Sequence, residues 1–288
     1  NTGKMNQTSI QDDSKEVKRM EMQLLYDDAY VDISEEVKYP PVAISCGSYT
    51  EKNTDGSTTE YPIPLGTYGN FSFIQAPPKV GKSFFTSLLT SAYLNNGNKL
   101  TGKIKGHRKG RNVIHFDTEQ GRFHAQKVFR RPIIMNGLET DDKYYTYALR
   151  NMSPSDRIDF IDYVLSDILE GKNIGLICID GVADLVADVN NLEQCSVAVQ
   201  KLMSWTDEYK CHIVTVIHSN YGSDKPTGHL GSFLEKKAEL QIKLEANHVN
   251  KGWVSVECKR SRNRGFEPFS FLINENGLPE FVDNSFDF

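Results

Sequence analysis

A β-prone run that leads into a Gly-Lys-Ser turn constrains the fold of this 288-residue chain more than any other feature. Residues 71–75 are mostly apolar or β-prone, a turn with two prolines follows, and Gly81-Lys82-Ser83 opens a stretch of helical periodicity. In such a strand–turn–helix, backbone N–H groups and the helix N-terminus converge on one point, where they attract an anion. The segment therefore predicts a phosphate-binding loop, or P-loop.

The P-loop pattern gives a role to individual positions of this turn. Lys82 would reach the β- and γ-phosphates of a nucleotide, and the Ser83 hydroxyl would hold Mg²⁺. The pattern departs from its usual form once, because Ala76 stands where the first glycine is expected. The predicted phosphate-binding set is Ala76, Pro77, Pro78, Lys79, Val80, Gly81, Lys82, Ser83 and Phe84.

Two further apolar runs end in carboxylates. One ends at Asp180, where a carboxylate would bind Mg²⁺ through water, together with Ser83. The other ends in Asp117-Thr118-Glu119 and lies between the P-loop and Asp180 in the chain. A glutamate just beyond a strand next to the P-loop strand can polarise the water that attacks the γ-phosphate of ATP. These residues predict ATP and Mg²⁺ as ligands.

From residue 61 onward, β-prone runs alternate with helical patterns. The β-prone runs are 70–75, 112–116, 144–149, 174–179 and 212–217. The helical patterns are 82–94, 155–170 and 192–209. Such alternation predicts an α/β fold with a mostly parallel central sheet. The last β-prone runs, 238–244, 253–259 and 268–273, have no long helix between them and predict an antiparallel C-terminal extension of that sheet.

The first 60 residues differ from the rest in charge and pattern. They contain 6 basic and 12 acidic residues, whereas the remaining chain contains 27 and 26. Residues 13–30 predict a helix with one apolar face, and residues 47–60 predict a loop or loose hairpin. We expect an acidic N-terminal extension over 1–60 and a nucleotide-binding domain over 61–288. The helix would dock on an adjacent protomer or fold back on its own core.

At the Glu119 segment the chain resembles the RecA-type ATPases. Their recombinases carry Tyr-Ile-Asp-Thr-Glu-Gly here, with that glutamate as catalytic base, and this chain reads His115-Phe-Asp-Thr-Glu119. The resemblance implies a RecA-like P-loop core with Glu119 as the base. It also implies that a side chain directly after residues 212–217 senses the γ-phosphate. His218 is the candidate and Asn220 the alternative, while a polar residue that only closes the strand fits as well.

Two later segments resemble hexameric replicative helicases. Residues 226–239 are similar to a segment of plasmid-replication helicases of the RepA type. Around Lys259, the sequence is similar to the Lys-x-Arg-Asn-Gly run of DnaB-type helicases, where a strand-end Lys and Arg reach the neighbouring subunit's ATP. By this resemblance Lys259, Arg260 and Arg262 would act in a homo-oligomer, such as a hexameric ring; the alternative is a solvated basic turn. A plasmid or other mobile element is the setting by analogy.

Two basic segments are candidates for contact with DNA, which we expect to be single-stranded. The segment 221–237 is the better candidate, because RecA-type proteins place a DNA loop after this strand. Its basic residues are Lys225, His229, Lys236 and Lys237. The glycine-rich segment 99–111 holds six basic residues and no acidic one. It fits a loop that neutralises phosphates or a mobile, solvated hairpin.

These features predict an ATP-hydrolysing motor of the RecA/RepA type that acts on DNA, as a replicative or mobilisation helicase. One alternative is a recombinase-like ATPase or helicase loader that remodels partners without unwinding. Another is a regulatory nucleotide-binding module with incidental turnover. The chain has no apolar run near the ~20 residues of a membrane span, no signal-peptide pattern and no paired metal-binding cysteines. We therefore expect a cytoplasmic protein of bacterial type with no membrane partner.

Overall fold

The computed structural model describes residues 2–220 and 223–283, and their side chains except for those of residues 2–14 and 28. Contacts between residues divide the chain into two units, Asn1–Tyr39 and Pro40–Phe288. None of the helices within these described ranges is long and apolar enough to cross a membrane.

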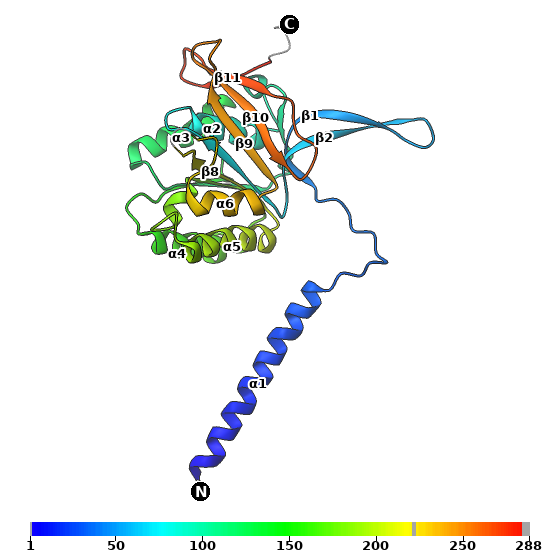
Figure 1. Ribbon diagram of the computed structural model, residues 1–288, viewed down its shortest axis with the longest axis vertical. Coiled ribbons are helices and arrows are strands. Elements are labelled where there is room, and N and C mark those ends of the chain that lie inside the picture. Colours follow the sequence, from blue (N-terminus) through cyan, green and yellow to red (C-terminus); the bar gives the residue numbers. More distant parts are fainter. Residues whose placement is uncertain (1, 221–222, 284–288) are drawn as a thin grey trace. The chain divides into compact units, whose positions relative to one another are not determined.

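The first unit contains one long helix, α1 (Thr2–Ala29) (Figure 1). The helix begins well before residue 13, so the predicted start is wrong. The residues ahead of position 13 include good helix formers and no proline, so nothing in them stops the helix from extending. The side chains predicted to form an apolar face, Val17, Met20 and Leu24, are exposed.

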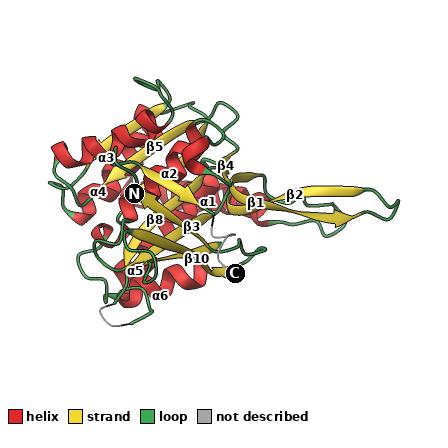
Figure 2. Ribbon diagram, turned by 90° about the horizontal axis from the view of Figure 1, so that it is seen from above, coloured by secondary structure: helices red, strands yellow, loops and turns green. Residues whose placement is uncertain are grey.

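The second unit begins with a long hairpin that projects from its body (Figures 1 and 2). The strands β1 (Val42–Lys52) and β2 (Thr58–Thr67) pair antiparallel, and β1 also pairs with β4 (Ile104–Gly106). Residues 47–60 therefore form the outer part of a regular hairpin. At its turn, Asp55 accepts the backbone N–H of Ser57 at 2.9 Å, an arrangement typical of a tight turn.

The body of this unit is a nine-stranded sheet in the order β12-β11-β10-β9-β3-β8-β7-β5-β6. Its parallel strands are β3 (Phe71–Ala76), β5 (Asn112–Asp117), β6 (Tyr144–Ala148), β7 (Ile174–Asp180), β8 (His212–His218) and β9 (Leu240–Ala246). The antiparallel strands are β10 (Trp253–Ser261), β11 (Phe269–Ile273) and β12 (Pro279–Val282). This sheet confirms the predicted α/β fold: a mostly parallel RecA-like core with an antiparallel C-terminal extension.

Helices cover both faces of the sheet. The helices are α2 (Lys82–Leu94), α3 (Arg122–Met135), α4 (Pro154–Tyr163), α5 (Leu192–Glu208) and α6 (Gly228–Lys237). The shorter helical segments are η1 (Lys99–Thr101), η2 (Val164–Ile168) and η3 (Val182–Leu185). In the central strand β7, Leu176 and Cys178 pack with α2 and α3, while Ile177 and Ile179 pack with α4, α5 and α6. Burial on both faces explains why this strand reads as a continuous apolar run.

Candidate functional site

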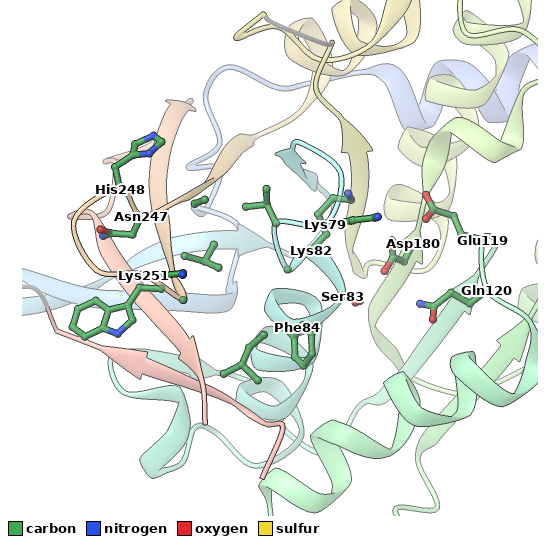
Figure 3. Close-up of a pocket in the computed structure, with 17 residues that line it drawn as sticks. Lys79, Lys82, Ser83, Phe84, Glu119, Gln120, Asp180, Asn247, His248 and Lys251 are labelled. Carbon is green, nitrogen blue, oxygen red and sulfur yellow. The ribbon is translucent and has the colours of Figure 1, made fainter. Parts of the chain in front are cut away.

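A cavity of 700 Å³ lies at the carboxyl-terminal edge of the parallel strands, where ligands commonly bind in open α/β sheets (Figure 3). P-loop residues from Lys79 to Phe84 line its centre. Glu119, Gln120 and Asp180 lie on one side of them, and the turn between β9 and β10 lies on the other. The fold thus brings together the P-loop and the two carboxylates that the sequence singled out.

The P-loop has the geometry of an anion site. Gly81 adopts a φ of 96°, a left-handed conformation that favours glycine, and α2 begins at the next residue. Ala76 is the last residue of β3 and is buried within the sheet, so this position does not need the freedom of the glycine that the pattern expects. Pro77 and Pro78 form the turn that leads from the strand to the cavity.

Lys82 is held inside the site by acceptors. Its Nζ lies 3.4 Å from the carbonyl oxygen of Pro77 and 3.0 Å from Nδ1 of His218. Burial lowers the pKa of Lys82, and the negative charges of Glu119 and Asp180 oppose that shift. The Lys82 amine is therefore largely desolvated, and two carboxylates favour its charged form.

His218 connects Lys82 to Glu119. An ammonium can only donate, so Nδ1 of His218 accepts from Lys82, and the ring proton then sits on Nε2. Nε2 faces Glu119 Oε1 at 3.3 Å, and this contact is the main cause of a lowered pKa for Glu119. The lowered pKa keeps Glu119 ionised, which is the state in which a carboxylate can accept a proton. Asn220 is exposed and its side chain lies 3.4 Å from the carbonyl oxygen of Pro226.

Asp117 and Thr118 shape the turn that carries Glu119. The Asp117 carboxylate accepts the backbone N–H groups of Glu119 at 3.0 Å and Gln120 at 2.8 Å. The Thr118 hydroxyl accepts the N–H of Gly181 at 2.8 Å and lies 2.8 Å from the Asp184 carboxylate. Glu119 is thereby fixed relative to the turn after β7. Sequence reasoning named neither residue as part of the site, although the Asx-turn signal of Asp117 was available.

Ser83 and Asp180 fit the chemistry of a Mg²⁺ site. Both line the cavity, and hydroxyl and carboxylate oxygens are the ligands that Mg²⁺ prefers. Burial, with Glu119 and Asp117 nearby, raises the pKa of Asp180 to about 7, and a bound cation would relieve that cost. The described residues contain no cluster of three or more ligating His, Cys, Asp or Glu side chains. A metal here would therefore also need phosphate and water oxygens.

The predicted trans-acting cations lie elsewhere. Lys259 and Arg260 lie near the end of β10 and Arg262 directly follows it, and none of these three lines the cavity of its own chain. Lys259 contacts Asp224, and Arg260 lies 3.8 Å from Glu235. Arg262 donates to the carbonyl oxygens of Lys236 at 3.4 Å and Lys237 at 3.1 Å, which satisfies the end of α6.

The candidate DNA contacts are exposed. Lys225 lies between β8 and α6, and His229, Lys236 and Lys237 lie on α6, all with exposed side chains. Tyr221 and Gly222, which belong to the same predicted segment, lie outside the described residues.

The segment 99–111 is not a loose basic loop. It contains η1 and β4, and the buried Arg108 pairs with Asp141 through two hydrogen bonds of 2.7 and 3.0 Å. The Arg111 guanidinium lies 4.0 Å from the centre of the Tyr68 ring. Its remaining cations, Lys99, Lys103, Lys105 and Lys109, are exposed, and Lys103 pairs with Asp283. The prediction of a mobile, solvated hairpin is therefore wrong, because two arginines hold the segment to the core.

The turn between β9 and β10 supplies the wall of the cavity that sequence reasoning missed. Asn247, His248, Lys251 and Trp253 all line it. These residues are far from the P-loop in the chain, and they reach it because β9 pairs with the P-loop strand β3. The available signal was a histidine and a lysine in this turn, with a tryptophan at the start of β10, but only the strand order makes them part of the site.

Comparison with known proteins agrees with this geometry. The model of the AAA_25 family, described as an AAA domain, matches residues 63–224, which is more than half of the chain. The matched region includes the P-loop, Glu119, Asp180 and His218. A search of curated proteins found no match. The chain belongs to the AAA_25 family of AAA domains, which are ATPases of the RecA-like type.

Proposed function

We propose that this protein hydrolyses ATP at the cavity described above and uses the energy to act on DNA as a homo-oligomer, in the manner of a helicase. The observation that carries the ATPase proposal is the contact chain from Lys82 through His218 to Glu119, beside Asp180 and at the start of α2. Cation, base and metal ligand then share one cavity with a helix N-terminus, which is the arrangement that phosphoryl transfer to water requires.

The nucleotide would enter with its phosphates at the P-loop. Backbone N–H groups from Lys79 to Ser83 and the N-terminus of α2 would hold the phosphate oxygens, and Lys82 would leave His218 to pair with them. Mg²⁺, held by Ser83 and Asp180, would supply positive charge against the γ-phosphate. The base would lie towards the turn between β9 and β10, where Trp253 offers an aromatic surface.

Glu119 would act as the general base. Its carboxylate lines the cavity opposite the turn between β9 and β10, and the contact with His218 lowers its pKa. It would accept a proton from the water that attacks the γ-phosphate. When Lys82 turns to the phosphates, His218 loses a partner and would be free to contact the γ-phosphate or the attacking water. His218 would therefore report whether the γ-phosphate is present.

The DNA and oligomer parts of this proposal rest on exposed cations. Lys225, His229, Lys236 and Lys237 would contact the nucleic acid backbone from the segment that follows His218. Lys259, with Arg260 and Arg262, would complete the ATP site of a neighbouring protomer. An ATPase that remodels partners without unwinding DNA would use the same site.

The test combines ATP turnover with nucleotide and DNA binding. Glu119→Gln should lower kcat by roughly 10²-fold or more while the affinity for a fluorescent ATP analogue stays close to that of the wild type. Wild-type turnover should rise with single-stranded DNA at low salt, and the assembly should be larger than a monomer by light scattering with ATP analogue and Mg²⁺. Full activity of the Glu119→Gln variant would rule out the assigned base. A rate of ATP turnover that does not change when DNA is added would favour the regulatory nucleotide-binding module.

A further inference from the structure

The described residues between β8 and α6, 219–220 and 223–227, form the two arms of a short hairpin anchored at His218. Ser219 and Pro226 form an antiparallel bridge, and the N–H of Asn220 donates to the carbonyl oxygen of Lys225 at 2.9 Å. At its base, the N–H and the hydroxyl of Thr227 donate to the carbonyl oxygen of His218, at 3.0 and 2.8 Å. These contacts therefore tie both described arms of the hairpin to the strand end that carries His218.

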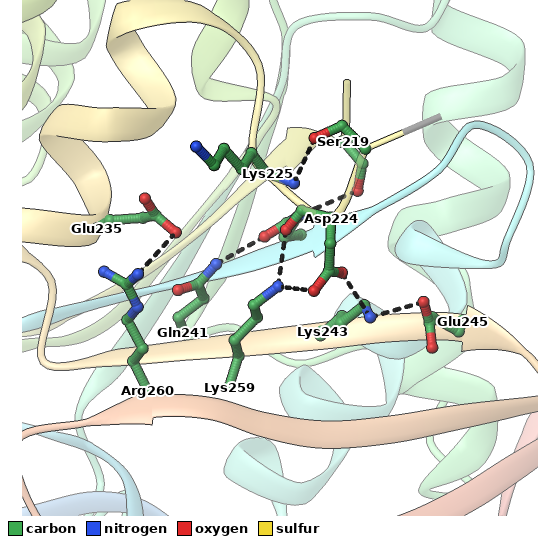
Figure 4. A network of polar contacts seen from close by, with 11 residues as sticks. Ser219, Asp224, Lys225, Glu235, Gln241, Lys243, Glu245, Lys259 and Arg260 are labelled. Atoms are coloured by element: carbon green, nitrogen blue, oxygen red, sulfur yellow. Dashed lines mark hydrogen bonds and ion pairs between the residues drawn. The ribbon is translucent and has the colours of Figure 1, made fainter. Parts of the chain in front are cut away.

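Asp224 of this hairpin pairs with two lysines from the neighbouring strands (Figure 4). Its carboxylate lies 2.5 Å from Nζ of Lys243 on β9 and also contacts Nζ of Lys259 on β10. The same Nζ of Lys259 donates to the Asp224 carbonyl oxygen at 2.7 Å. These contacts lower the pKa of Asp224, so the carboxylate stays ionised at neutral pH.

The two lysines differ in how much they depend on Asp224. Lys243 has a second carboxylate, that of Glu245, at 2.7 Å. For Lys259, both hydrogen bonds found within the described residues go to Asp224, one to its carboxylate and one to its carbonyl oxygen. The Lys259 side chain is only 22% exposed, so it lies along the surface of the sheet. Asp224 therefore determines where the Lys259 ammonium sits, whereas Lys243 would keep a partner without it.

A buried glutamine joins this pair to the P-loop strand. Gln75, which directly precedes Ala76 at the end of β3, donates to the Ser219 hydroxyl at 3.1 Å and to the Asp224 carbonyl oxygen at 3.2 Å. The side chain of Gln241 on β9 donates in turn to Gln75 at 2.6 Å. The Asp224 carbonyl oxygen is thus shared by Gln75 and Lys259. A shift at the end of β3 or β8 would move Asp224 and, with it, Lys259.

We propose that Asp224 is a positioning residue that holds Lys259 in the place from which it serves a neighbouring protomer's ATP. This inference rests on the proposed function, in which Lys259 acts in trans. A lysine has a long flexible stem, and a flexible charge contributes less to a transition state than one held in place. The two arginines have contacts of their own on α6: Arg260 lies near Glu235, and Arg262 donates to carbonyl oxygens at the helix end. Asp224 provides the corresponding contact for Lys259.

The experiment compares Asp224→Asn with Glu245→Gln, which also removes one carboxylate from the same ion-pair network. Asp224→Asn should lower kcat by roughly 10- to 100-fold, the cost of a misplaced catalytic group, with little change in the affinity for a fluorescent ATP analogue. The kcat of Glu245→Gln should stay within about twofold of the wild-type value. Asp224→Glu keeps a carboxylate, so its kcat should lie between those of Asp224→Asn and the wild type. The thermal midpoint of each variant, measured alongside, separates positioning from loss of fold.

A double-mutant cycle identifies the partner. If Asp224 acts through Lys259, the variant Asp224→Ala with Lys259→Ala should be no slower than Lys259→Ala alone. The proposal would be overturned if the two substitutions lowered kcat independently, so that their fold-changes multiplied in the double variant. An Asp224→Asn variant with wild-type kcat would overturn it as well. A wild-type protein without ATP turnover would instead overturn the proposed function, and the role of Lys259 with it.

Lysine acetylation tests the contact itself without relying on turnover. With a limiting amount of reagent and detection by mass spectrometry, Lys259 should react more slowly than the exposed Lys225 in the wild type. Its reactivity should rise several-fold in Asp224→Asn and stay unchanged in Glu245→Gln. Equal reactivity of Lys259 in the wild type and in Asp224→Asn would show that Asp224 does not hold this lysine.

Discussion

The two halves of the sheet contribute to the cavity in different ways. On the parallel side, each site residue stands at or just after the end of a strand or at the start of α2, as Asp180 and Lys82 do. On the antiparallel side, the residues that line the cavity come from the turn between β9 and β10, the start of β10 and the end of β11, and Lys259 lies further along β10. The parallel side carries recognisable motifs. The antiparallel side supplies part of the cavity wall and cations such as Lys259, whose role depends on their contacts with other elements of the fold.

On the parallel side, a large effect is expected at Thr118. Thr118→Val removes the hydroxyl that ties the Glu119 turn to Gly181 and Asp184 while keeping the shape of the side chain. We expect kcat to fall roughly 10-fold or more, because Glu119 loses its fixed position. The unpaired N–H of Gly181 should also cost about 1–3 kcal/mol of stability.

Thr215→Val is the matched control for this change. The Thr215 hydroxyl is also buried, but it lies within β8 and donates to the Ile179 carbonyl oxygen of β7 at 2.9 Å rather than to the turn after β7. Steady-state kinetics and urea unfolding of both variants separate the two effects. Equal kcat values for the two valine variants would show that the Thr118 contact has no part in catalysis.

A smaller effect is expected on the antiparallel side, at Trp253. Trp253→Ala should weaken nucleotide binding by roughly 5- to 10-fold, the worth of one aromatic contact, and leave kcat at saturating ATP nearly unchanged. Trp253→Phe should bind almost as well as the wild type, since it keeps an aromatic ring. Titration with a fluorescent ATP analogue measures both. A large fall in kcat at saturating ATP would mean that Trp253 takes part in the chemistry of its own chain's site and does not only bind the nucleotide.

The last prediction concerns stability and its dependence on pH, at His115 on the parallel side. Burial lowers the pKa of His115 to about 3, so the folded protein keeps this ring neutral while the unfolded chain takes up a proton near its ordinary value of 6.5. Its contribution to stability is therefore complete above pH 6.5 and is lost as the pH falls from 6.5 towards 3. Urea unfolding at pH 7.5 and pH 5 should show a smaller loss of stability for His115→Gln than for the wild type. The same substitution at the exposed His124 should leave the loss unchanged.

Local patterns in the sequence accounted for most of the parallel side. The P-loop, Asp180 and Glu119 each follow a β-prone run, and the carboxyl ends of parallel strands meet at one edge, so their meeting could be expected from the fold class. The start of α1 was predicted wrongly because helix ends are set by weak local preferences. The segment 99–111 was misjudged because its charge says nothing of Asp141 and Tyr68, which bind Arg108 and Arg111.

The sequence by itself determined the fold class and the position of the P-loop motif, because those features depend on neighbours within a few positions of the chain. The tertiary structure alone decided that the turn between β9 and β10 lines the site, that Thr118 ties Glu119 to Gly181, and that Asp224 holds Lys259. Each of these joins residues that are distant in sequence, through strand order and side-chain contact. Such contacts arise only when the whole sheet is assembled, so no local pattern records them.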